Sequence, residues 1–105
     1  MSVTAGKKAE FARRLAEAGY DDFLILDKRD AEEVLTEKRQ ELLELIAEED
    51  PESITELAHV ADRDVSIVHR DLDLLFEYSL VEYEEEDGKK RPKLKHRHVF
   101  VEPLF

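Results

Sequence analysis

Residues 53–82, SITELAHVADRDVSIVHRDLDLLFEYSLVE, have the pattern of two short helices joined by a tight turn. Ser53 followed three residues later by Glu56 is a capping box, which satisfies two of the free amide groups at a helix start. Apolar residues at helical spacing follow, and Asp64, the last residue of the turn, can cap a second helix over about residues 65–78. The segment therefore predicts a helix-turn-helix.

The second helix of this segment has two different faces on a helical wheel. The apolar face is predicted to point to the core, and it consists of Val65, Val68, Leu72, Leu75 and Phe76. The opposite face is polar, as in a recognition helix that enters the DNA major groove, and it carries Ser66, His69, Arg70, Asp73 and Glu77. A merely solvated helix has a similar polar face, but the capped helix and short turn before it favour recognition.

A further apolar stripe on the same helix consists of Ile67, Leu74 and Tyr78. Three large apolar side chains on one line are expected to be covered by other parts of the chain. Either the hairpin that follows or the apolar run at residues 23–26 can supply that cover within one subunit.

The region after the helix-turn-helix is predicted to form a β-hairpin. Residues 80–84 alternate like a strand, Asp87 and Gly88 mark the hairpin tip, and residues 94–101 provide the returning strand. Pro92 cannot donate to a strand ladder and is placed at the base of the loop or on an edge.

The first third of the chain is predicted to be helical with one short apolar interruption. Residues 5–18 form a helix that ends at Gly19, and its alanine-rich face suits close packing against a partner helix better than loose docking on the domain. Residues 23–26, FLIL, suit a buried strand, although four residues cannot separate strand from helix by periodicity. Asp30 is expected to cap a single turn, and Thr36 to cap a helix over residues 37–48.

Four segments give the chain a resemblance to the winged helix-turn-helix regulators, broadly MarR-like, and it looks most similar to the small DNA-binding proteins of archaea, especially haloarchaea. The segments are LTEKRQELLELI from Leu35, PESITELA from Pro51, RDVSIVHRDLDLL from Arg63 and SLVE from Ser79. The resemblance covers roughly residues 22–102. It implies an α+β fold with a helical core and a C-terminal hairpin, the wing, so that residues 22–105 are the winged domain and residues 1–21 an N-terminal helix that can serve dimerisation.

Two positions depart from the pattern of these proteins. They usually have glycine where this chain has Asp62 and again where it has Ser79. Aspartate tolerates a left-handed backbone better than most residues, so the turn at Asp62 is expected to survive. Because of Ser79, the sequence does not determine where the recognition helix ends.

Charge is distributed unevenly along the chain. The net charge of −11 argues against a nucleic-acid binder, but residues 1–86 hold 25 acids against 10 Lys and Arg, whereas residues 87–98 hold one acid against six bases. An acidic body with only eight lysines is also typical of halophile proteins, whose self-repulsion is screened by molar salt, although an ordinary acidic domain has a similar balance.

The resemblance and the charges together predict a homodimeric transcriptional regulator bound to double-stranded DNA. Base contacts are expected from Arg63, Ser66, His69 and Arg70. Phosphate contacts are expected from the wing bases, which are Lys89, Lys90, Arg91, Lys93, Lys95 and Arg97. The alternative is a winged helix used only for protein–protein interaction, because residues 64–77 contain four acids against one arginine.

Other classes of function find no support in the sequence. No nucleophile elbow, phosphate-binding glycine loop or zinc-binding helix is present, so neither an enzyme nor a cofactor is predicted. There is no cysteine, and His96 and His98 have no identifiable third metal ligand. No apolar run is long enough to span a bilayer and the start has no signal-peptide pattern, which predicts a cytoplasmic protein without a membrane partner.

Overall fold

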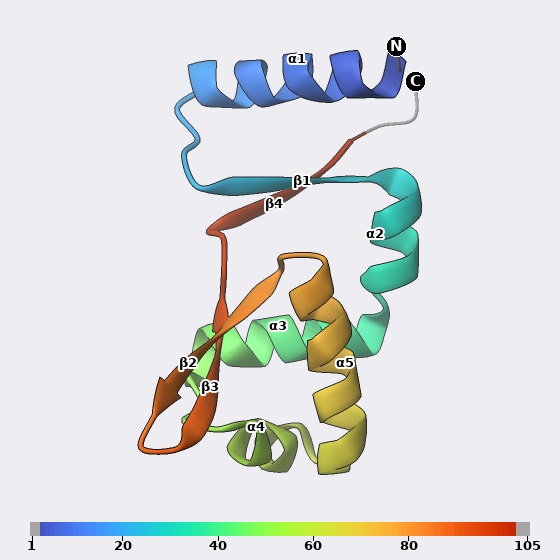
Figure 1. Cartoon of the computed structure of the whole chain (residues 1–105). Helices are drawn as coiled ribbons and strands as arrows, with labels where there is room; N and C mark the ends of the chain where they lie inside the picture. Colours follow the sequence, from blue (N-terminus) through green and yellow to red (C-terminus); the bar gives the residue numbers. More distant parts are fainter. Residues whose placement is uncertain (1–2, 103–105) are drawn as a thin grey trace.

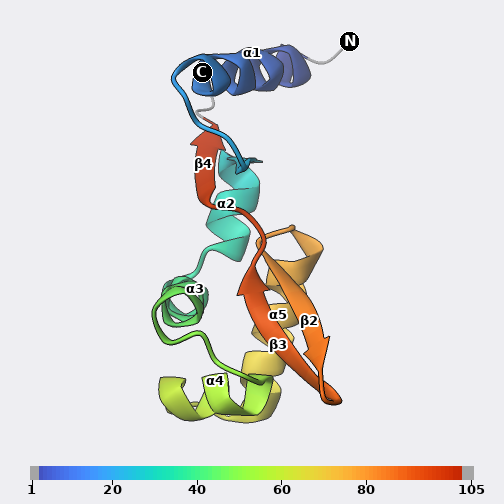
Figure 2. The same ribbon diagram turned by 90° about the vertical axis from the view of Figure 1, so that its left-hand side faces the viewer.

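A computed structural model of the chain describes the backbone of residues 3–102 and the side chains of residues 8–102. Helices and strands follow one another as shown in Figure 1: α1 (Val3–Glu17), β1 (Phe23–Asp27), α2 (Lys28–Val34), α3 (Glu37–Glu49), α4 (Ile54–Ala61), α5 (Val65–Glu77), β2 (Val81–Glu86), β3 (Lys89–Leu94) and β4 (His98–Glu102). Helices α3, α4 and α5 with the β2–β3 hairpin form the winged helix-turn-helix body. Strands β1 and β4 form a second small sheet between this body and α1, here called the platform (Figures 1 and 2).

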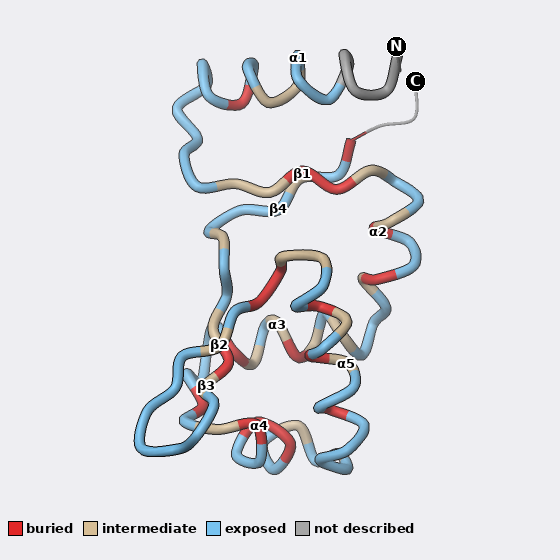
Figure 3. Tube along the Cα trace, in the orientation of Figure 1, coloured by how far each residue is buried: buried red, intermediate tan, exposed pale blue. Residues whose placement is uncertain are grey.

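The core lies where α2 to α5 meet the start of the hairpin (Figure 3). Its most completely buried side chains are Val34, Leu42, Leu57, Val68, Leu72, Leu75 and Val81. The predicted core stripe of α5 is thus confirmed at Val68, Leu72 and Leu75. The same prediction is wrong for Val65 and Phe76, which are 44% and 51% exposed, because they lie on the flank of a buried stripe that is narrower than expected.

The three predicted helix starts in the body are confirmed by side-chain caps. Thr36 accepts a hydrogen bond from the Arg39 amide at 3.3 Å, Ser53 accepts one from the Glu56 amide at 3.0 Å, and Asp64 accepts one from the Ser66 amide at 2.8 Å. The Glu56 carboxylate accepts in return from the Glu52 amide at 3.1 Å. Local sequence therefore determines where α3, α4 and α5 begin.

Helix α2 begins earlier than predicted. Asp27, the last residue of β1, caps it by accepting a hydrogen bond from the Asp30 amide at 2.8 Å, so Asp30 lies inside the helix and is not its cap. The extended backbone of Asp27, with ψ at 162°, suits both the strand that ends there and the helix that follows.

The hairpin forms as predicted, but its returning strand is β3, Lys89–Leu94, and not residues 94–101. Pro92 lies within β3 opposite Tyr83, where the unpaired outer edge of the strand needs no amide donor. Charged residues made this segment look like a loop in the sequence. In the fold they are opposite the acidic residues of β2, and opposite charges across two strands stabilise the pairing.

Residues 23–26 adopt the strand alternative as part of β1, which pairs in parallel with β4 from Phe23↔His98 to Asp27↔Glu102. Helix α1 docks on this platform through aromatic side chains. The Phe100 ring lies 6.3 Å from Phe11, 5.1 Å from Tyr20 and 6.1 Å from Phe23, all in edge-to-face geometry. Phe11 and Leu15, rather than the alanines, thus provide the contact face of α1 within the subunit.

The stripe formed by Ile67, Leu74 and Tyr78 is only partly covered. Leu74 and Tyr78 are half-buried, and burial raises the pKa of Tyr78, with Asp30 and Glu33 of α2 raising it further. Tyr78 therefore lies beside α2. Ile67 stays 48% exposed, so the expected cover does not reach the start of α5.

Candidate nucleic-acid interface

The outward face of α5 carries Ser66 and Arg70, both exposed. Ser66 is held at the helix start, since its amide and its hydroxyl both donate to the Asp64 carboxylate. These hydrogen bonds lower the pKa of Asp64, which keeps that carboxylate charged. Arg70 lies one turn later and donates to no other residue in the described part of the chain, so its guanidinium is free for a ligand.

His69 faces the side of α5 that leads to the wing. Its Nδ1 lies 3.2 Å from Asp73 Oδ2, and the two side chains are 50% and 58% exposed. Asp73 also accepts a hydrogen bond from the Tyr83 hydroxyl at 3.4 Å. Burial and the neighbouring Asp73 carboxylate raise the pKa of Tyr83 to about 12, so this hydroxyl keeps its proton and remains a donor.

Arg63 is placed inside the body and not on the outward face of α5. Its side chain is 14% exposed, and Nη2 donates to Asp71 Oδ2 at 2.7 Å. The other Asp71 oxygen accepts from Arg39 Nε at 3.2 Å, and Arg39 also donates to the carbonyls of Glu33 and Val34. This cluster of Arg39, Arg63 and Asp71 joins the helix-turn-helix to α3.

Asp71 therefore differs from what its position in the sequence suggests. Two arginines compensate its charge, so it is not a free anion beside the recognition residues. Sequence reasoning missed Arg39 altogether, because Arg39 and Asp71 are 32 residues apart and no local pattern relates them.

The bases of the wing are matched by acids on the neighbouring strand. The register places Lys89, Lys90, Arg91 and Lys93 opposite Glu86, Glu85, Glu84 and Glu82. Residues 81–94 thus hold five acids against four bases, and the hairpin is a mixed ribbon where a basic tip was expected. The charge count in the sequence began at residue 87, so it left out the acids of β2 that pair with these bases.

The four bases of β3 differ in how far other side chains engage them; they are Lys89, Lys90, Arg91 and Lys93. Lys93 Nζ bonds to Asp50, whose pKa it lowers, and Arg91 lies 3.7 Å from Glu86 with its side chain 23% exposed. Lys89 and Lys90 are exposed, and Lys90 Nζ lies 5.6 Å from the centre of the Tyr83 ring. That ring stacks on Phe76 of α5 at 5.4 Å, which ties the wing to the recognition helix.

Lys95 and Arg97 lie apart from the other predicted phosphate contacts. They follow β3 and lead into β4, where the Lys95 amide donates to the Leu80 carbonyl and Arg97 Nη1 lies 4.0 Å from Asp21. The structure thus links His69 to the hairpin through Asp73 and Tyr83, and Ser66 and Arg70 lie on the exposed face of α5. Lys95 lies at the base of the hairpin and Arg97 beside the platform.

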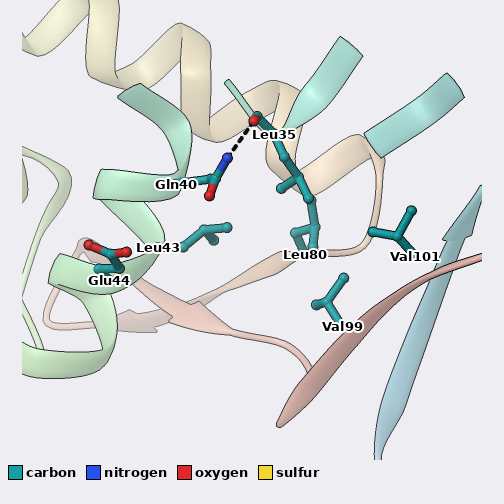
Figure 4. A pocket seen from close by; sticks show the side chains of 7 residues that line it. All are labelled: Leu35, Gln40, Leu43, Glu44, Leu80, Val99 and Val101. Atoms are coloured by element: carbon teal, nitrogen blue, oxygen red, sulfur yellow. Dashed lines mark hydrogen bonds between the residues drawn. The ribbon is translucent and has the colours of Figure 1, made fainter. Parts of the chain in front are cut away.

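A cavity of about 240 Å³ lies between α3 and β4 (Figure 4). It is lined by Leu35, Gln40, Leu43, Glu44, Leu80, Val99 and Val101. Gln40 is already engaged, because its side-chain amide donates to the Leu35 carbonyl at 2.7 Å. The remaining surface is mainly aliphatic and offers little to fix a polar ligand.

Within the described residues no group of three His, Cys, Asp or Glu side chains is arranged to hold a metal ion, and His96 is 3.1 Å from Asp22. None of the described helices is both long and apolar enough to cross a bilayer.

The comparisons with known proteins concern both the fold and the family of the chain. The chain is similar to the solution structure of Mb0332 (residues 1–100) from Mycobacterium bovis, described as a homodimeric winged helix-turn-helix DNA-binding domain and a possible ArsR-family transcriptional regulator. The TM-score is 0.58 at 17% identity, and the match covers 90% of this chain and 76% of that one. This confirms the winged helix-turn-helix fold, while the MarR-like subdivision stays a prediction. No curated protein matches the chain.

A family model narrows the assignment further. It is the model HVO_A0114, and it matches residues 34–101, which is more than half of the sequence and includes α3, α4, α5 and the whole wing. The chain therefore belongs to the HVO_A0114 family.

Proposed function

We propose that this protein is a DNA-binding transcriptional regulator that reads duplex DNA with α5 as a homodimer in the cytoplasm. The observation that carries the proposal is the free guanidinium of Arg70 on the outward face of the second helix of a helix-turn-helix. Arginine can donate two hydrogen bonds to the major-groove edge of guanine. Ser66 and His69 lie beside it and complete a small base-reading surface.

The wing is proposed to supply phosphate contacts, which position the protein without reading sequence. Lys89 and Lys90 are the principal candidates because both are exposed near the tip. Arg91 and Lys93 can contribute once DNA phosphates compete with their carboxylate partners, and Lys95 and Arg97 are assigned a minor part because of their distance along the chain from the tip. Arg63 is proposed to act by positioning α5 through Asp71.

A second candidate function is protein–protein interaction, and a specific observation favours it. Phe76 and Tyr83 form a stacked pair beside the recognition face with Phe76 51% exposed, and Asp73, Glu77 and Glu85 around them are exposed acids. Exposed aromatic side chains often anchor protein interfaces, and the acids disfavour phosphates.

A titration against duplex DNA separates the two functions. A preferred site is first selected from random duplexes, and binding of the wild type, Arg70→Ala and the double variant Lys89→Ala/Lys90→Ala is then measured on that site and on random DNA from low to molar KCl. Arg70→Ala is expected to lose about 1–3 kcal/mol on the preferred site and much less on random DNA. The wing variant should weaken both alike and reduce the salt slope by roughly 0.9 for each lost contact.

Arg14→Ala is the matched control, because Arg14 is 73% exposed on α1, away from the helix-turn-helix, and its only described ion pair is with Glu10 on the same helix. It should bind as the wild type does. If the wild type binds no duplex at any salt concentration, the DNA-binding proposal is wrong and the interaction function replaces it.

A further inference from the structure

Ile67 is an apolar side chain in the first turn of α5, and it is 48% exposed. It directly follows Ser66 and comes three residues before Arg70. Residues three or four apart on a helix are surface neighbours, with Cβ atoms about 5–6 Å apart. Ser66, Ile67 and Arg70 thus form one patch at the N-terminal end of α5, which is the end of a recognition helix that contacts base edges.

The flank of α5 that carries Ile67 differs in charge from the flank that faces the wing. Both acids on the Ile67 flank are engaged, because two arginines compensate Asp71 and Asp64 accepts two hydrogen bonds at the helix start. On the wing side Asp73 is 58% exposed, and its partner His69 carries a charge only when protonated. The Ile67 flank therefore repels an anionic duplex less.

The described part of the chain leaves Ile67 uncovered. The hairpin packs on the opposite side of α5, where Phe76 stacks on Tyr83, and α2 lies beside Tyr78 at the far end of the helix. Burial of an aliphatic side chain is favourable. An exposed isoleucine beside the free guanidinium of Arg70 gains this stabilisation when α5 enters the groove of a duplex.

We propose that Ile67 reads the 5-methyl group of a thymine in the major groove, next to the guanine that Arg70 binds. The methyl group is the apolar feature of the major-groove edges, and apolar side chains contact it. Isoleucine has no side-chain donor or acceptor, so it can select thymine only through this group. Successive bases of one strand are about 3.4 Å apart, so the distance between the two side chains places the thymine within about two base pairs of the guanine. The inference rests on the proposed function, to which it adds a second element of base specificity.

Removal of single methyl groups from the DNA tests this contact. The site is selected from unmodified duplexes, in which thymine alone carries a 5-methyl group, and uracil then replaces one thymine at a time. The guanine is identified as the base whose replacement weakens binding of the wild type but not of Arg70→Ala. At one thymine beside it, uracil should raise the Kd of the wild type about fourfold, as expected for one buried methyl group.

Ile67→Ala should lose this preference and bind the thymine and uracil duplexes equally, because its shortened side chain does not reach the methyl group. Val101→Ala is the matched control, since Val101 is 44% exposed and lies on β4 in the platform. It should keep the preference of the wild type. Each preference is a ratio of two Kd values from one preparation, so a variant that is only partly folded still gives a valid ratio.

An Ile67→Ala variant that still prefers thymine overturns the inference. A wild type that binds its selected duplex but prefers thymine at no position near the guanine also overturns it, and both results leave the proposed function intact. A wild type that binds no duplex overturns the proposed function, and this contact with it.

Salt gives a further check on the nature of the contact. Salt screens charges and weakens phosphate contacts, but it does not screen an apolar contact. The preference for thymine should therefore persist from low to molar KCl while the overall affinity falls. A preference that disappears in molar KCl contradicts an apolar contact by Ile67.

Discussion

At the scale of single residues, the least expected side chain is Asp71. In the sequence it directly follows Arg70, one of the expected base contacts. In the fold its carboxylate is 13% exposed and accepts from Arg39 and Arg63, whose side chains are 20% and 14% exposed. Removing one partner from a largely buried ion cluster leaves the other charges uncompensated, which costs more than the ion pair contributes.

Asp71→Asn is therefore expected to lower the free energy of unfolding by about 3 kcal/mol, because the amide cannot compensate two arginines. Chemical denaturation at a fixed molar KCl concentration measures this. The control is Asp73→Asn, two residues further on, whose carboxylate is 58% exposed and pairs with His69; it should cost less than about 1 kcal/mol. Equal losses for the two variants would show that the cluster does not bear on stability.

At the scale of elements, three helices end in the same way. Beyond α1, α4 and α5 the chain turns through a left-handed residue, which is Gly19, Asp62 or Ser79 with φ of 97°, 56° and 65°. In each case the next residue donates its amide to a carbonyl five positions back, as Leu80 does to Leu75 at 2.9 Å. This is the Schellman arrangement, which favours glycine at the left-handed position. The second and third of these positions, Asp62 and Ser79, are those where the resemblance to winged helix-turn-helix regulators implies glycine.

Ser79→Gly is expected to stabilise the protein by about 1 kcal/mol, since it relieves the left-handed strain of a residue that carries a Cβ. Gly19→Ser is the matched reverse change. No other atom lies within 4 Å of a Cβ added at Gly19, so only backbone strain should act, and the variant should lose stability. Thermal unfolding of both variants, followed by circular dichroism, measures the two shifts. Shifts of the same sign would refute the explanation by backbone strain.

Elements differed in how well the sequence predicted them, for a physical reason. Helices α3, α4 and α5 start where expected, because Thr36, Ser53 and Asp64 cap them through contacts two or three residues away. Strand β4 was assigned to the wing, because its pairing with β1 joins residues more than seventy positions apart. No local period carries information about such a contact.

The candidate DNA-binding residues show the same difference between local and long-range contacts. The helical period alone predicts that Ser66, His69 and Arg70 lie on an exposed face, and all three are exposed. The partners that engage Arg63 and Lys93 are Asp71 and Asp50, which are 8 and 43 residues away, and neither pair follows from a repeat. Contact of these exposed side chains with DNA is the prediction that the titration tests.

At the scale of the whole molecule, charge acts on folding and on DNA binding in opposite directions. The whole molecule carries a net charge of −11 and has extents of 43 × 25 × 22 Å. Salt screens repulsion among the acids and so favours the compact state. The same salt weakens phosphate contacts by reducing the gain from counterion release. A protein adapted to molar salt therefore depends more on base contacts such as that proposed for Arg70.

The melting temperature is accordingly expected to rise from low to molar KCl, because the acidic excess over residues 1–86 repels itself when it is unscreened. Glu44→Gln/Glu48→Gln tests the cause, since both side chains are exposed on α3 and lie one turn apart, where like charges repel. This variant should melt higher than the wild type in low salt and approach it in molar KCl. A parallel series in sucrose, which stabilises proteins without screening charge, should keep the two curves apart. If the wild-type melting temperature is flat or falls with KCl, the inference that the protein is adapted to high salt is wrong. The assignment of the winged helix-turn-helix fold is unaffected by that result.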